Sequence, residues 1–196
     1  RAIAKFRRLA LASAITLTTP IMVQADMDLL IDGGNITYTG DSVMLRQDGD
    51  VDIHIKGTNG AYVVGPDNAS IAVAQMGYSG LVEIDGIIAF NIHPYATGTD
   101  GFTYATVTDA DMVGGVRLNN IIAMCSTGAS TAAAITIRYT DGAWVSNVEM
   151  HGYRHGIQWW GGDSNPAENG APANERKCRN IYIDNCHVYD SASTST

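Results

Sequence analysis

The sequence from Asn180 to Asp190, NIYIDNCHVYD, alternates apolar and polar residues almost without interruption. Successive side chains of a β-strand point to opposite faces, so a period of two predicts a strand with one buried face. Ile181, Ile183 and Val188 are expected on that face, and the polar side chains between them are expected outside. No sustained helical pattern competes with this one.

Similar short phrases recur upstream, each rich in β-branched residues and closed by glycine, asparagine or aspartate. They occupy residues 30–33, 51–57, 82–88, 116–122 and 135–138. The turn residues of successive phrases, Asp85, Asn119, Asn147 and Asn185, are separated by 34, 28 and 38 residues. A repeat with constant strands and variable loops is typical of a solenoid.

The turn residues favour an all-β fold of one kind, a right-handed parallel β-helix. Glycine and asparagine tolerate the left-handed backbone that the corners of stacked coils need. The chain has 196 residues, of which 45% are hydrophobic, with 21 glycines and 5 prolines, and this composition is typical of a folded protein with a substantial core. A jelly roll or another β-sandwich is the alternative fold.

The first 26 residues form a segment of their own. Residues 2–14 predict a short amphipathic helix that caps the open end of the coils, followed by a first strand over residues 15–23. The alternative is a secretory signal, because a basic start and an apolar run precede a plausible cleavage point after Ala25.

Residues 27–196 are expected to form the coils, with a long loop at 161–178. A serine- and threonine-rich run follows the last strand phrase, and no terminal cap is evident at either end. Because a solenoid needs capping repeats, we expect this chain to be a fragment of a longer one.

Charge and cysteine content limit the partners and cofactors. The formal net charge of −8 disfavours nucleic acid and anionic lipid as partners, and the first apolar run is too short and too polar for membrane insertion. The three cysteines, Cys125, Cys178 and Cys186, lack a Cys-x-x-Cys spacing, so buried free thiols are expected. His151 and His155 each precede a glycine in a strand-and-turn context, so helical metal-ligand spacing does not apply. We expect no metal and no other cofactor.

Three adjoining phrases carry a resemblance to a known family. They are HGIQWWGGD at residues 155–163, NERKCRN at 174–180, and the strand phrase that runs on to residue 190. Together they resemble bacteriophage tailspike depolymerases of the pectate-lyase-like β-helix type, in particular those that degrade capsular or colanic-acid-like exopolysaccharide. The resemblance is strongest over residues 135–190 and weaker over 28–134.

This resemblance implies a homotrimeric spike at a virion tail, whose chains bind bacterial surface polysaccharide along a groove and cleave its glycosidic bonds. Hydrolysis is the expected reaction. One alternative is a polysaccharide lyase that acts by β-elimination on a uronate-containing glycan, and another is a non-catalytic β-helical adhesin or structural spike. The alternative location is that of a secreted bacterial protein.

Hydrolysis of a glycoside needs one protonated carboxyl group to assist the leaving oxygen and one ionised carboxylate to activate water or attack the sugar. Asp163 and Glu175 are the preferred pair, with Glu168 as a third candidate, because all three lie close in sequence to the tryptophan pair. Asp163 follows two glycines, which form a flexible exit from a strand. The alternative role for each acid is to stabilise a turn.

Substrate binding is expected from the residues that precede this loop. Sugars present apolar C–H faces that pack on aromatic rings. Trp159 and Trp160 are adjacent, so in a strand they point to opposite faces and only one can line an external sugar platform. Tyr153 is expected to be a second ring. The polar contacts are expected from His155, Arg154 and Arg176, whose alternative role is that of solvated loop side chains.

Overall fold

The computed structural model describes residues 7–41, 43–66, 72–76, 80–97, 115–126, 130–138, 140–160 and 179–189. All regular structure in these ranges is β-strand, and every strand pairing is parallel. The all-β prediction is therefore confirmed. A jelly roll is excluded for this part of the chain, because its strands are antiparallel.

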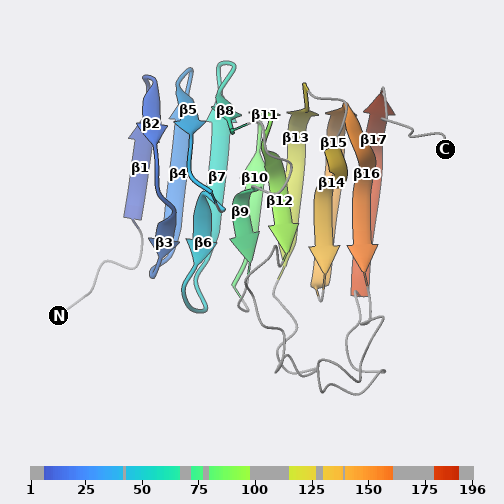
Figure 1. The fold of residues 1–196 in the computed structure, drawn as a ribbon. Helices are drawn as coiled ribbons and strands as arrows, with labels where there is room; N and C mark the ends of the chain where they lie inside the picture. The colour runs from blue at the N-terminus through green and yellow to red at the C-terminus, as the bar shows by residue number, and fades with distance from the viewer. Residues whose placement is uncertain are drawn as a thin grey trace.

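The strands form two sheets that lie face to face (Figure 1). The first, sheet A, contains the short strands β1 (Arg7–Leu11), β2 (Ile15–Leu17), β4 (Met27–Asp32), β5 (Asn35–Tyr38), β7 (Ile53–Thr58), β8 (Tyr62–Val64), β10 (Val82–Asp85) and β11 (Ile88–Phe90), and the long strands β13 (Val116–Met124), β15 (Asp141–His151) and β17 (Arg179–Tyr189). The second, sheet B, contains β3 (Ile21–Val23), β6 (Leu45–Gln47), β9 (Ala72–Met76), β12 (His93–Thr97), β14 (Ser130–Arg138) and β16 (Tyr153–Trp160).

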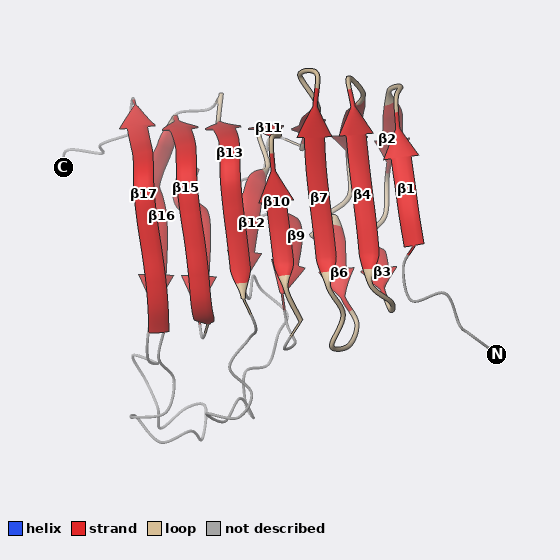
Figure 2. Ribbon diagram, turned by 180° about the vertical axis from the view of Figure 1, so that it is seen from behind, coloured by secondary structure: helices blue, strands red, loops and turns tan. Residues whose placement is uncertain are grey.

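The pairing pattern repeats every three strands in the first part of the chain. β1 pairs with β4, β4 with β7 and β7 with β10, while β2, β5, β8 and β11 form a second ladder and the strands of sheet B a third. Strand β13 belongs to two ladders, because its first half pairs with β10 and its second half with β11. Figure 2 shows the ladder from β1 to β17 in front of sheet B. This arrangement is compatible with a parallel β-helix.

Because the strands pair in register, side chains of the same kind line up across neighbouring strands. These columns of side chains fill the space between the sheets. One column contains Leu29, Ile55, Ile84, Leu118 and Val145, which are in register on five neighbouring strands and are each 3% exposed or less. Side chains of sheet B such as Leu45, Tyr95 and Ile135 pack in the same core. Burying each large aliphatic side chain contributes roughly 1.5–3 kcal/mol.

Asparagine residues make the bends within the long strands. Asn120, Asn147 and Asn185 have φ angles of 52°, 54° and 47°, in the left-handed region that asparagine tolerates better than most residues. Their side-chain amides also connect neighbouring strands, since Asn185 Nδ2 donates to Asn147 Oδ1 at 2.8 Å and Asn147 Nδ2 donates to Asn119 Oδ1 at 2.9 Å. The predicted left-handed corners are confirmed at Asn147 and Asn185.

The predicted N-terminal helix is wrong. Residues 7–11 form strand β1, which pairs in register with β4, and the predicted strand over 15–23 is two strands, β2 and β3, that belong to different sheets. Strand pairing satisfies the backbone polar groups of β1 and aligns Leu11 with the buried Ile31, so tertiary packing overrides the local helical preference. Residues 1–6 lie outside the described part of the chain.

The long loop predicted at residues 161–178 also lies outside the described residues, between Trp160 at the end of β16 and Arg179 at the start of β17. The described residues include no helix that could cross a membrane.

Candidate functional site

Four of the predicted site residues, Asp163, Glu168, Glu175 and Arg176, lie outside the described part of the chain. The other five lie on β16, where the side chains of Arg154 and Trp160 are also outside the description. Trp159, Tyr153 and His155 are therefore the predicted site residues whose surroundings the structure gives.

Tyr153 lies in the core. Its side chain is 2% exposed, its hydroxyl donates to the Ile92 carbonyl oxygen at 3.2 Å, and its ring centroid is 5.6 Å from that of His93. Burial raises the pKa of the Tyr153 hydroxyl well above its usual value. This environment is that of a packed interior residue, so the ring expected to contact sugar is instead part of the core.

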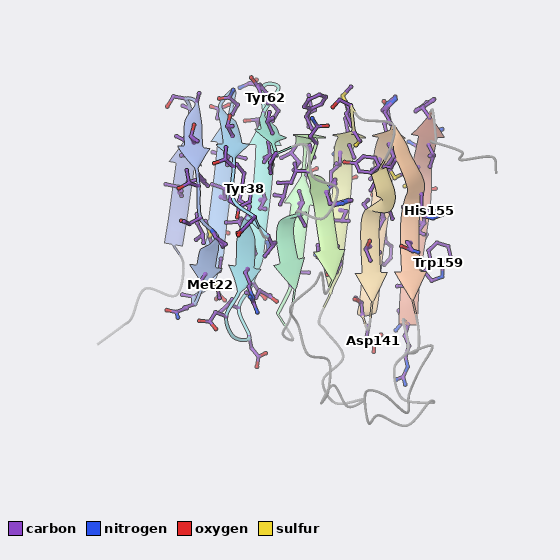
Figure 3. All side chains as sticks on the ribbon, viewed as in Figure 1. Met22, Tyr38, Tyr62, Asp141, His155 and Trp159 are labelled. Carbon is purple, nitrogen blue, oxygen red and sulfur yellow. The ribbon has the colours of Figure 1, made fainter. Side chains whose placement is uncertain are left out.

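Trp159 is 55% exposed, but it is on the core-facing side of sheet B. It pairs in register with Ile137, which is fully buried, and paired residues of parallel strands point to the same face. His155 is exposed and pairs in register with the buried Ala133. The residue after it, Gly156, faces the core, because a Cβ there would meet the side chains of Val188 and Met150. Trp159 is exposed because β16 is the last strand of sheet B in the described chain, and Figure 3 shows its ring at that end of the row of strands.

The outer face of sheet A carries a row of polar and aromatic side chains that crosses the strands. We call it the outer row, and its members are Asp28, His54, Glu83, Arg117, Trp144 and Tyr182. Each is in register with the next, and the first five each lie one residue before a member of the buried column that begins at Leu29. Tyr182 precedes Ile183, which pairs with the last member of that column, Val145. The alternation of the strands therefore places this row on the opposite face from the core.

Trp144 and Tyr182 form an exposed aromatic pair in the outer row. Their ring centroids are 4.6 Å apart with an angle of 36° between the ring planes. The Trp144 side chain is 56% exposed and that of Tyr182 is 44% exposed. Both residues are within paired strands, so the backbone holds the two rings side by side on a rigid surface.

At the other end of the outer row the surface is hollowed and acidic. A groove of about 490 Å³ is lined by Asp28, Leu29, Leu30, His54, Ile55, Lys56, Glu83 and Asp85. His54 Nδ1 and a Glu83 carboxylate oxygen are 3.1 Å apart. The Asp85 carboxylate accepts hydrogen bonds from the amides of Asn119 and Asn120, at 3.2 and 2.9 Å. Two of the three acids in this groove are thus held by neighbouring side chains.

The described residues contain no cluster of histidine, cysteine and acidic side chains that could hold a metal ion. His151 and His155 are on different strands, β15 and β16, with the left-handed Gly152 between them. Cys125 and Cys186 are partly buried, while Cys178 lies outside the description. Burial raises the pKa of the Cys186 thiol, so its environment does not favour the reactive thiolate.

Sequence reasoning missed Glu83, Arg117, Trp144 and Tyr182 as candidate site residues. A signal was present, because each lies three residues before a turn residue of positive φ, namely Gly86, Asn120, Asn147 and Asn185. Residues at the same offset from successive corners of a stacked structure align across the strands. Aligning the phrases on these corners would have placed the four residues in one row.

No family model matches the chain, and no curated protein or solved structure matches it either.

Proposed function

We propose that this chain is a right-handed parallel β-helix that binds a bacterial surface polysaccharide on the outer face of sheet A. The observation that carries the proposal is the exposed aromatic pair of Trp144 and Tyr182, whose ring centroids are 4.6 Å apart. Monomeric soluble proteins rarely expose large apolar groups together unless the patch binds something. The repeating parallel pairing of the strands supports the fold part of the proposal.

The chemistry of the outer row suits a sugar chain better than a small apolar ligand. Aromatic rings provide apolar surface for the C–H faces of sugars, while carboxylate, imidazole and guanidinium groups can hydrogen-bond to hydroxyls. Neighbouring strands are about 4.8 Å apart, so the outer row from His54 to Tyr182 extends over about 19 Å. This length accommodates several consecutive sugar units of an extended polysaccharide.

The proposed reaction is hydrolysis of the bound polysaccharide, as in a tailspike depolymerase displayed as a homotrimer at a virion tail. Asp163, Glu168 and Glu175 are the proposed acids. The segment that contains them joins β17 at Arg179, three residues from Tyr182 and thus about 10 Å along the strand.

Replacing Trp144 by alanine is expected to weaken polysaccharide binding about tenfold, because stacking on a large ring contributes about 1.4 kcal/mol. Tyr182→Ala is expected to have a similar effect. The measurement is calorimetric titration of the purified chain with a panel of capsular and colanic-acid-type polysaccharides, after thermal unfolding has shown that each variant folds.

Tyr189→Ala is the matched control. Tyr189 is on the same strand as Tyr182 and is 43% exposed, but it lies beyond the bend at Asn185 and stacks on His151. Equal losses for the Tyr182 and Tyr189 variants would contradict a site at the aromatic pair. Failure of the wild-type chain to bind any polysaccharide would count against the function itself.

Cleavage is tested separately on the polysaccharides that bind. New reducing ends without absorbance from unsaturated uronate are the result expected for hydrolysis, and both signals together would indicate a lyase. Asp163→Asn, Glu168→Gln and Glu175→Gln then identify the acid and the base. Binding without any cleavage would favour a non-catalytic spike or adhesin.

A further inference from the structure

Arg117 occupies a distinctive position in the outer row. It is exposed, it lies on β13, and its in-register neighbours are Glu83 on one side and Trp144 on the other. The guanidinium group is therefore located between the acidic groove and the aromatic pair.

No acidic side chain of the described chain forms an ion pair with Arg117. Its neighbour Glu83 directs a carboxylate oxygen to His54 on the opposite side, at 3.1 Å. Asn119 lies two residues after Arg117 on β13. Its side-chain amide oxygen accepts hydrogen bonds from the Ser146 hydroxyl and the Asn147 side-chain amide. The neighbouring groups of the strand ladder are thus engaged with each other, and Arg117 keeps its hydrogen-bonding capacity for another partner.

Among the described residues, the surface beside Trp144 is open at Gly142. Gly115 lies two residues before Arg117, and Gly142 lies two residues before Trp144. A Cβ placed on Gly115 would be 3.2 Å from Leu81 Cδ1 and 3.6 Å from the Gly142 carbonyl oxygen, so the two glycines are neighbours. Neither has a side chain, and a Cβ at Gly142 would meet no atom within 4 Å. A substituent of a sugar stacked on Trp144 can therefore approach the guanidinium from this side.

We propose that Arg117 determines specificity for an acidic sugar, by binding the carboxylate of a uronate unit that stacks on Trp144. This inference rests on the proposed polysaccharide binding at the aromatic pair. A guanidinium presents a planar fork of donors that matches a carboxylate and forms two parallel hydrogen bonds with it.

Electrostatics determines at which end of the outer row the acidic group binds. The chain has a net charge of −8, and the groove that includes Glu83 is lined by three carboxylates and one lysine. An anionic group is repelled by that groove and attracted by Arg117, so the uronate is bound at the aromatic end of the outer row. Because Arg117 is exposed, this attraction weakens as salt is added.

The test uses one glucuronate-containing capsular polysaccharide in two forms, native and with its carboxyl groups chemically reduced to alcohols. The wild-type chain is expected to bind the native form about tenfold more tightly, since hydrogen bonds to charged groups contribute at least that much. Arg117→Gln is expected to abolish this preference and to leave affinity for the reduced form unchanged within about twofold. Arg117→Lys retains the charge but loses the fork, and an intermediate preference is expected.

Arg46→Gln on β6 of sheet B is the control for the change in net charge, and it is expected to preserve the preference of the wild type. Equal binding of both polysaccharide forms by the wild-type chain would overturn the role of Arg117 and leave polysaccharide binding intact. An equal loss for both forms in Arg117→Gln would likewise overturn it. If the wild-type chain binds neither form nor any polysaccharide of the panel, the proposed function fails as well.

Discussion

Replacing Gly86 by alanine is expected to lower the free energy of unfolding by about 3–4 kcal/mol, whereas the same change at Gly60 is expected to cost about 1 kcal/mol. Both glycines have a φ angle of +75°, so alanine suffers the same left-handed backbone strain at either position. They differ in their surroundings. A Cβ at Gly86 would overlap the carbonyl oxygen of Gly57, while a Cβ at Gly60 would meet no atom within 4 Å.

The difference in the free energy of unfolding between the two variants measures the steric cost of the close contact between Gly57 and Gly86. At that contact the backbones of the neighbouring strands β7 and β10 meet at a corner. Gly57 and Gly86 follow paired residues of β7 and β10, and a Cβ on Gly57 would in turn overlap the Gly86 carbonyl. Urea unfolding followed by circular dichroism gives both values, provided that the slope with denaturant stays constant. Equal costs at Gly60 and Gly86 would contradict this contact and the register that produces it.

The sequence pattern was sufficient to predict the strands and two of their corners, at Asn147 and Asn185, because both depend on local chemistry. At the predicted corners Asp85 and Asn119 the left-handed residue is instead the next one, Gly86 and Asn120. Alternation of apolar residues identifies a strand with one buried face, and asparagine at a fixed place after it identifies a left-handed bend. Asn147 and Asn185 illustrate this, since each lies within a long strand and has a positive φ. Local pattern is reliable where the local preference and the packing agree.

The N-terminal strand could not be predicted in this way. Residues 7–11, RRLAL, contain arginine, leucine and alanine, which all favour a helix when considered alone. The strand conformation results from pairing with Met27–Asp32, which is some twenty residues away in sequence. A short segment becomes a strand when a neighbouring strand is available to pair with it. No property of the five residues themselves identifies that neighbouring strand.

The candidate site was only partly accessible to sequence reasoning for the same reason. Adjacent tryptophans in a strand must point to opposite faces, which is correct for any strand, but the register decides which face is the core. Trp159 pairs with the buried Ile137, whereas Trp144 pairs with the exposed Arg117. Trp144 lies outside the three phrases that carry the resemblance, which begin at residue 155, and its importance depends on a neighbour, Tyr182, that is 38 residues away.

Ile84→Ala is expected to lower the free energy of unfolding by about 3 kcal/mol, because removing three buried carbons leaves a cavity that a rigid stack cannot close. Ile84 is fully buried, with Ile55 and Leu118 in register on either side. Ile183→Ala makes the same chemical change at the end of the same column, on β17, where the side chain is 38% exposed. There the expected cost is about 1 kcal/mol, since part of the removed surface is already in water.

The measurement is equilibrium unfolding in urea, with both variants compared with the wild type at one temperature. It tests whether the core-facing side of β17 is open to solvent or covered. A small cost for Ile183→Ala, with a large one for Ile84→Ala, is the result expected if β17 presents its core-facing side chains to solvent. Equal costs would mean that Ile183 is covered in solution, and the same cover would then extend over Trp159 at the end of sheet B. Because Trp144 and Tyr182 are on the opposite face of their strands, either outcome leaves the proposed aromatic platform exposed.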